Sequence, residues 1–157
     1  MDILKQQYEL VLGSRGAMLD FIERAIGQGL ITPIKEFNGS NIRYLLVHTA
    51  ETYKHWCANF PLQLALPYVN EDDIVNIPAI RKLYSEADNM VANLLQKYGG
   101  NLVVPITSKT RRGLELTLTP LQLFTHVITH EYHHKGQIMT MCRLLGHIPP
   151  DTDAIRF

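Results

Sequence analysis

Four of the chain's seven histidines lie within one short stretch, and their spacing could create a metal site. On an α-helix, residues four positions apart lie on one face, one turn apart. His126, His130 and His134 would therefore form a column, and two such imidazoles can hold one metal ion between them. The same stretch satisfies the HExxH pattern of zinc peptidases, in which Glu131 would be the general base.

The apolar pattern around His130 and His134 favours a metal site. Both histidines occur among residues such as Val127 and Ile138 at helical spacing, so we expect their imidazoles to point inward or toward one end of the bundle interior. An unsatisfied buried polar group costs about 1–3 kcal/mol, and two adjacent buried imidazoles cannot both carry charge cheaply. A divalent ion that accepts both neutral nitrogens removes this cost.

His48 is the candidate for a third ligand, because it lies between Leu45 and Thr52 in another helical pattern. Three imidazoles from two helices would form an open site, in which water or substrate takes the remaining positions. A single histidine on an apolar face is more often a core residue with its hydrogen bonds satisfied, so both interpretations of His48 stay open at this point. The other histidines are assigned to the surface, the core or the surroundings of the site.

The context of the HExxH pattern argues against a peptidase. Only 23 residues follow His134, and they contain no histidine or glutamate on a second helix, since His147 falls in the terminal link. The longer metzincin pattern requires glycine at position 137, where this chain has Gln137. In a three-histidine site Glu131 would lie off the ligand face and would have no role as a base.

Periodic apolar residues predict four helices, over about 3–27, 41–58, 78–98 and 119–145. Between the third and the fourth, alternation of Leu114, Leu116 and Leu118 with polar residues predicts a small hairpin. We therefore expect an all-α fold, a four-helix bundle with long links between helices and a hairpin before the last helix, with residues 1–157 forming a single domain.

The charge balance argues against a nucleic-acid-binding protein, because 15 basic and 15 acidic residues leave no net charge. The only tight basic cluster is Lys109, Arg111 and Arg112, which we interpret as a solvated turn. Arg43 and Lys54, on the second helix, are also expected to be solvated.

Two cysteines far apart in the sequence, Cys57 and Cys142, form no disulfide framework. Both fall in apolar helical patterns, which predicts buried free thiols and a cytoplasmic location. The N-terminal residues lack the features of a signal peptide, and no apolar stretch reaches the length of about 18 residues that a membrane span requires.

The last helix and the segment around His48 resemble the DinB/YfiT-like family of metal-binding four-helix bundles. The stretch His130-x-x-x-His134-Lys135-Gly136-Gln137 is similar to the family's H-x-x-x-H-[RK]-G-Q pattern. Residues 144–151 resemble the family's leucine-glycine, proline and aspartate ending, and residues 45–51 resemble the segment that carries its first histidine.

This resemblance implies that His48, His130 and His134 bind a divalent ion, with nickel or zinc the leading candidates. It also implies a homodimer and a metal-dependent thiol S-transferase, in which a low-molecular-weight thiol or an electrophile is the small-molecule partner. The alternative is a non-catalytic, stress-related metal-binding bundle, and an HExxH metallopeptidase is a third hypothesis. The resemblance assigns no catalytic or cofactor-binding residue beyond the three metal ligands.

Overall fold

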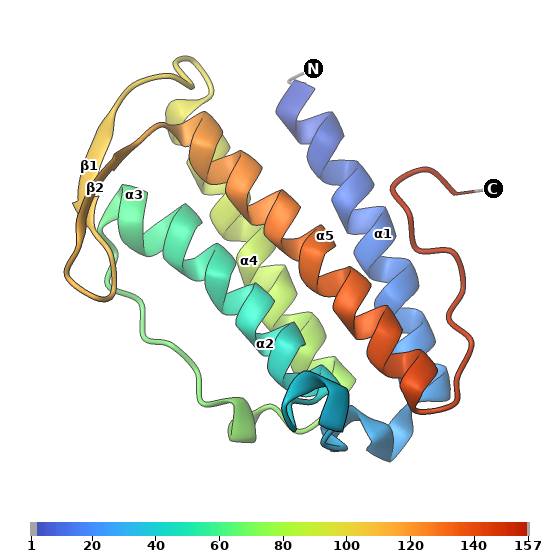
Figure 1. The fold of residues 1–157 in the computed structure, drawn as a ribbon. Coiled ribbons are helices and arrows are strands. Elements are labelled where there is room, and N and C mark those ends of the chain that lie inside the picture. The colour runs from blue at the N-terminus through green and yellow to red at the C-terminus, as the bar shows by residue number, and fades with distance from the viewer. Residues whose placement is uncertain (1–2, 157) are drawn as a thin grey trace.

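Four long helices run side by side in the computed structural model, which describes residues 3–156 (Figure 1). They are α1 (Ile3–Ala25), α2 (Ile42–Tyr53), α4 (Ile77–Tyr98) and α5 (Pro120–Leu144). The predicted all-α bundle is confirmed, and the predicted helix limits agree with these within a few residues, apart from the end of the second helix.

Side-chain caps explain where three of these helices begin. The carboxamide oxygens of Asn41 and Asn76 accept hydrogen bonds from the first-turn amides of α2 and α4. Thr119 and Gln122 form a reciprocal capping box at the start of α5, followed by Pro120 at the first helical position. Each such cap stabilises a helix by about 1 kcal/mol, so the positions of the starts are encoded locally.

The second helix continues past its predicted end near residue 58. After Tyr53 the chain forms a π-helical segment, η3 (Lys54–Asn59), and then the short α3 (Phe60–Leu62). Pro61 does not end the helix, because it lies in the first turn of α3, where a missing N–H is tolerated. The helical path stops at Gln63, whose backbone is left-handed (φ +53°).

A two-stranded hairpin precedes α5, as predicted. Strand β1 (Ile106–Lys109) pairs antiparallel with β2 (Glu115–Leu118), and Ile106 lies opposite Leu118. The tight connection includes Gly113, which has a left-handed backbone (φ +80°). The hairpin lies beside α3 at one end of the bundle (Figure 1).

Two basic side chains expected to be solvated lie in ion pairs instead. The Arg43 side chain is 12% exposed, and its Nη2 lies 2.6 Å from a carboxylate oxygen of Asp72 in η4 (Glu71–Asp73). Lys54 is buried, with Nζ 2.6 Å from a carboxylate oxygen of Glu51. The expectation was wrong because the partner of Arg43 comes from a distant link, and because the link after the second helix covers Lys54, whose Nζ also donates to the Pro67 carbonyl. Both predicted free thiols are buried, as expected.

A charged network crosses the core and links all four long helices. Arg15 of α1 donates from Nε and Nη2 to the two carboxylate oxygens of Glu131 of α5, at 2.8 and 2.9 Å. Tyr53 of α2 donates its hydroxyl to Glu131 at 2.6 Å, and Arg15 also pairs with Asp88 of α4 at 2.6 Å. Because a buried charge is costly unless it is paired, this network restricts how the helices can rotate against one another.

The C-terminal segment is fixed by a second buried charge. Lys135 donates to the Ser14 hydroxyl at 3.0 Å and to the Thr152 backbone carbonyl, and Ser14 also donates to that carbonyl at 2.6 Å. The segment therefore lies along α1 (Figure 1). Among the described residues, no helix combines the length and apolar character needed to cross a membrane.

We predict that Glu131→Gln lowers the free energy of unfolding by about 3 kcal/mol, because it leaves the buried Arg15 charge with only Asp88 to balance it. Urea denaturation of the purified protein measures this change. Glu23→Gln is the matched control, since Glu23 pairs with Arg81 at the exposed surface and its loss should cost less than about 1 kcal/mol. Equal losses of stability in the two variants would show that the buried ion pair contributes no more to the free energy of unfolding than the exposed one.

Candidate metal centre

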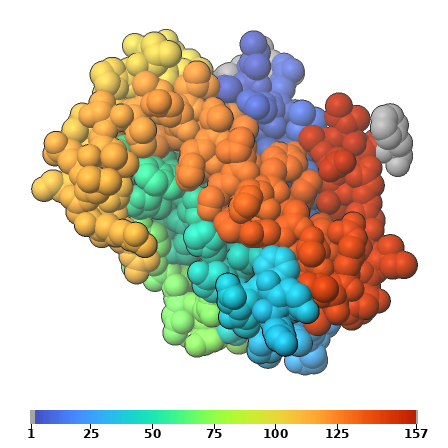
Figure 2. All heavy atoms as spheres, in the orientation of Figure 1, coloured from blue at the N-terminus to red at the C-terminus, as the bar shows by residue number. Residues whose placement is uncertain are grey.

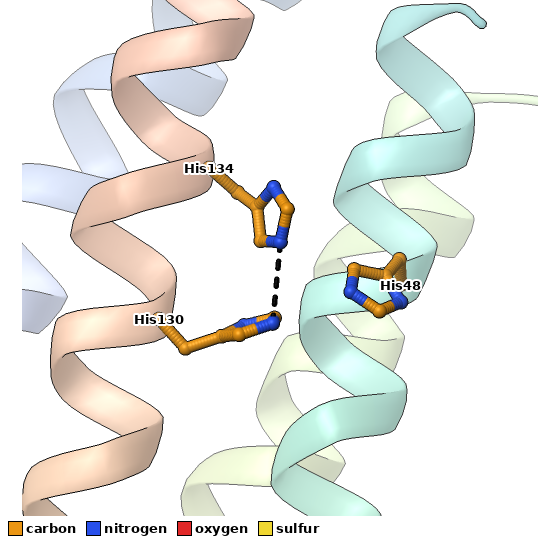
Figure 3. A group of neighbouring side chains, drawn as sticks. All are labelled: His48, His130 and His134. Carbon is orange, nitrogen blue, oxygen red and sulfur yellow. Dashed lines mark hydrogen bonds between the residues drawn. The ribbon is translucent and has the colours of Figure 1, made fainter.

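Three histidines converge between α2 and α5. His48 comes from α2, and His130 and His134 come from consecutive turns of α5 (Figure 3). One ring nitrogen of each can be chosen so that the three lie within 4.8 Å of one another. The ring centroid of His48 is 5.0 Å from that of His130 and 4.9 Å from that of His134. The structure therefore brings together the three residues proposed from the sequence, in a group that could bind a metal ion.

The histidines occupy the margin of the core and not its centre. His48, His130 and His134 are half-buried, whereas the fully buried face of α5 carries Glu131 and Lys135. The expectation that the imidazoles point into the interior was thus wrong in detail, because the buried network takes that face of the helix. In the space-filling view the surface of α2 is recessed between the hairpin and α5 (Figure 2). This placement gives a small molecule access to the imidazoles.

Hydrogen bonding fixes the tautomer of His134. Its Nδ1 lies 2.6 Å from Oε1 of Gln137, one turn further along α5. An amide oxygen only accepts, so Nδ1 carries the proton and Nε2 keeps its lone pair. That Nε2 lies 3.2 Å from Nε2 of His130. Gln137 therefore orients one ring for metal binding, as partners of metal-ligating histidines commonly do.

The electrostatic environment of these imidazoles favours their neutral form. Burial lowers the pKa of His48 and of His134, and it lowers the pKa of His130 to about 3, with the neighbouring histidines adding to the effect. Nδ1 of His130 is also buried without a hydrogen-bond partner among the described residues. Imidazoles whose ring nitrogens lie this close together fit a divalent first-row ion, for which the neutral imidazole is a favoured donor.

Glu131 cannot act as the base of an HExxH peptidase in this structure. Its carboxylate is buried and accepts hydrogen bonds from Arg15 and Tyr53. A general base must come within hydrogen-bond reach of a water beside the ion, and this carboxylate lies on the inner face of α5, adjacent to the face that carries the histidines. The chain therefore matches the HExxH pattern in sequence but not in geometry, because its glutamate belongs to the core.

A small pocket adjoins the histidine group and was missed in the sequence. It has a volume of about 200 Å³ and includes His48 in its wall. Its other lining residues come from the second helix, from the link that follows it and from the hairpin turn: Glu51, Thr52, His55, Trp56, Tyr68 and Arg111. The helical spacing of His48, Thr52 and His55 was the one available signal, whereas Tyr68 and Arg111 lie in segments without a periodic pattern.

The remaining histidines of α5 surround the group without joining it. His126 and His133 are exposed, and their ring centroids lie 5.6 Å from that of His130 and 5.0 Å from that of His134, respectively. Among the described residues, the group with converging ligand atoms contains His48, His130 and His134 alone. The column predicted from His126 to His134 is present, but its first member lies outside the metal group.

Comparison with known protein families agrees with the resemblance noted in the sequence. The sequence model described as the DinB family matches residues 2–157. No curated protein matches the chain.

We predict that chelator-treated protein loses stability as the pH falls below about 6.5, the ordinary pKa of an unfolded histidine. The pKa of His130 is about 3 in the folded state, so the unfolded chain takes up a proton that the folded chain excludes. The stabilising effect of the neutral ring is complete above pH 6.5 and declines toward pH 3. Urea denaturation between pH 8 and pH 4 should show a shallower decline for His130→Gln, and identical slopes would contradict the assignment.

Proposed function

The chain belongs to the DinB family, and from this premise we propose that it is a metal-dependent thiol S-transferase with its ion held by His48, His130 and His134. The observation that supports the proposal most directly is the convergence of three imidazoles from two helices at a half-buried position. Three protein ligands leave positions open for a small molecule, as in catalytic rather than structural sites.

The bound ion would lower the pKa of a coordinated thiol and so supply a thiolate near neutral pH. The chain's own residues hold and orient the site. Gln137 directs Nε2 of His134, and the closely packed α2 and α5 fix the separation of His48 from the other two rings. Nickel and zinc are the proposed ions, because both accept imidazole donors.

The nearby carboxylates support a mechanism without a separate carboxylate base. Glu131 is engaged in the core, and Glu51 is paired with Lys54 and accepts the Val69 amide. The transfer of a metal-activated thiol does not demand another base, whereas hydrolysis of a peptide by the zinc peptidase mechanism does. A thiol transfer that needs no carboxylate base is therefore consistent with the engagement of both carboxylates.

A non-catalytic metal-binding bundle is the second candidate, and the size of the pocket favours it. Ligand pockets usually have volumes of about 300–1,000 Å³, whereas the pocket beside His48 has about 200 Å³. A site of this size accepts part of a substrate at most, and a protein that only binds the ion would need no more.

We predict that protein purified without a histidine tag contains one divalent ion per chain, and that His48→Ala, His130→Ala and His134→Ala each lose most of it. Each substitution removes one of three donors, so the affinity should fall by more than about tenfold. Elemental analysis after dialysis measures the content. His147→Ala is the control, since His147 lies outside the group. Full occupancy in His48→Ala would exclude the three-ligand assignment.

We predict that the metal-loaded protein accelerates the conjugation of at least one low-molecular-weight thiol to an electrophile such as 1-chloro-2,4-dinitrobenzene. Chelation and His130→Ala should both abolish the acceleration, because both remove the activated thiolate. Absorbance of the conjugate gives the rate. Metal-loaded protein that accelerates none of a panel of thiols would favour the non-catalytic candidate, and chelator-sensitive cleavage of casein would instead support a peptidase.

A further inference from the structure

Part of the wall of the pocket beside His48 comes from the link that follows the second helix. Residues 63–70 form no helix or strand, yet side chains of the second helix hold their backbone in place. Asn59 exchanges two hydrogen bonds with the Leu66 backbone, at 2.9 and 2.7 Å. Lys54 donates to the Pro67 carbonyl at 2.9 Å, and Glu51 accepts from the Val69 amide at 3.2 Å. Tyr68 is therefore fixed from both sides.

Tyr68 connects the helix to the hairpin turn. Its hydroxyl lies 2.7 Å from Nδ1 of His55, and the guanidinium carbon of Arg111 lies 4.5 Å from its ring centroid. The turn that carries Arg111 is ordered by its own hydrogen bonds, since Thr110 accepts from the amides of Gly113 and Leu114. A guanidinium stacked on an aromatic ring still presents its donors at the edge.

Apart from its contact with the Tyr68 ring, the Arg111 guanidinium has no charged or hydrogen-bonded partner among the described residues. Among the described residues, no carboxylate lies in an ion pair with Arg111 and no group accepts a hydrogen bond from it. The one carboxylate in the pocket wall, that of Glu51, is neutralised by Lys54 at 2.6 Å. Burial lowers the pKa of His55, and the nearby Arg111 and His126 lower it further, which disfavours a second positive charge in the pocket. The pocket therefore carries a net positive charge from Arg111.

The backbone of η3 contributes to the shape of this pocket. Lys54, His55 and Trp56 lie in its π-helical turn, a rare conformation that is frequently found at functional sites. His55 and Trp56 line the pocket, and Lys54 donates a hydrogen bond to the Pro67 carbonyl. Consecutive residues of this turn therefore line the pocket and bind the link that forms part of its wall.

We propose that Arg111, which lies over the Tyr68 ring, binds a carboxylate group of the substrate, while the remainder of the molecule extends past His48 to the three-histidine group. The volume of about 200 Å³ suits such a group and a few attached atoms. A planar guanidinium matches a carboxylate in a bidentate geometry. The assignment of this group to the substrate rests on the proposed function and narrows it to small carboxylate-bearing thiols or electrophiles. The anion subsite itself does not depend on a bound metal.

The first experiment tests the subsite in chelator-treated protein. Propionate and propionamide have nearly the same shape and differ in charge, and Trp56, the chain's only tryptophan, lines the pocket and reports binding by its fluorescence. Titrations at low ionic strength, checked by NMR shift changes of the Trp56 indole, should show about tenfold tighter binding of the carboxylate, since charge-assisted hydrogen bonds are about twice as strong as neutral ones.

Arg111→Gln should remove this preference, whereas Arg112→Gln should retain it, because Arg112 is the neighbouring cation of the same turn and does not line the pocket. Equal affinities of the two ligands in the parent protein, or a preference that survives in Arg111→Gln, would overturn the proposal. Tyr68→Phe keeps the ring beneath Arg111 and should preserve the preference. This second pocket variant shows whether a substitution in the pocket wall by itself abolishes binding.

The second experiment separates the subsite from the proposed function. Cobalt-substituted protein is titrated with 3-mercaptopropionate and with 3-mercaptopropionamide, and thiolate binding is followed by the charge-transfer absorption. A carboxylate preference of about tenfold that depends on Arg111 supports both proposals. If propionate binds through Arg111 but neither thiol reaches the cobalt, the subsite stands and the thiol transferase is excluded. If both thiols bind the cobalt with equal affinity, the assignment of a carboxylate-bearing substrate is excluded, while the thiol transferase proposal stands.

Discussion

The buried ion pair between Arg15 and Glu131 determines how the last helix faces the rest of the bundle. Two charges removed from water are costly unless they satisfy one another, and here the guanidinium meets both carboxylate oxygens. Tyr53 and Asp88 complete the network from the other two long helices. A rotation of α5 that exposed Glu131 would leave the Arg15 charge buried without its main partner. The ion pair therefore holds α5 in one rotational position.

That rotational position in turn places the histidines. Successive residues of an α-helix point about 100° apart, so a helix that directs Glu131 into the core directs His130 away from it. Lys135 lies one turn after Glu131 and is also buried, bound to Ser14 and Thr152. Its predecessor, His134, is turned outward by the same angle. The two charged residues thus fix the inner face of α5, and the two histidines lie on the adjacent face, toward α2.

Much of this could be predicted from the sequence, because the relevant signals are local. Helix starts follow from caps such as Thr119 with Gln122, and the pairing of His130 with His134 follows from their spacing. The burial of Glu131 and Lys135 could not be predicted, since their partners lie 116 and 121 residues away in sequence. A charged residue in an apolar pattern is normally expected at the surface, and the pattern alone assigned the inner face to histidine.

The pocket was unpredictable for a related reason. The wall next to the histidine group is helical, but Tyr68 lies in a link and Arg111 in a turn. The position of the link depends on Asn59 and Lys54, whose side chains donate to its backbone carbonyls. Binding residues are often carried by loops that a rigid scaffold supports. Here the imidazoles belong to helices that the core network holds in place, whereas Arg111, whose charge would select a substrate, belongs to the hairpin turn. Under the proposed role of Arg111, a change at this residue would alter which molecule is accepted without disturbing the three histidines.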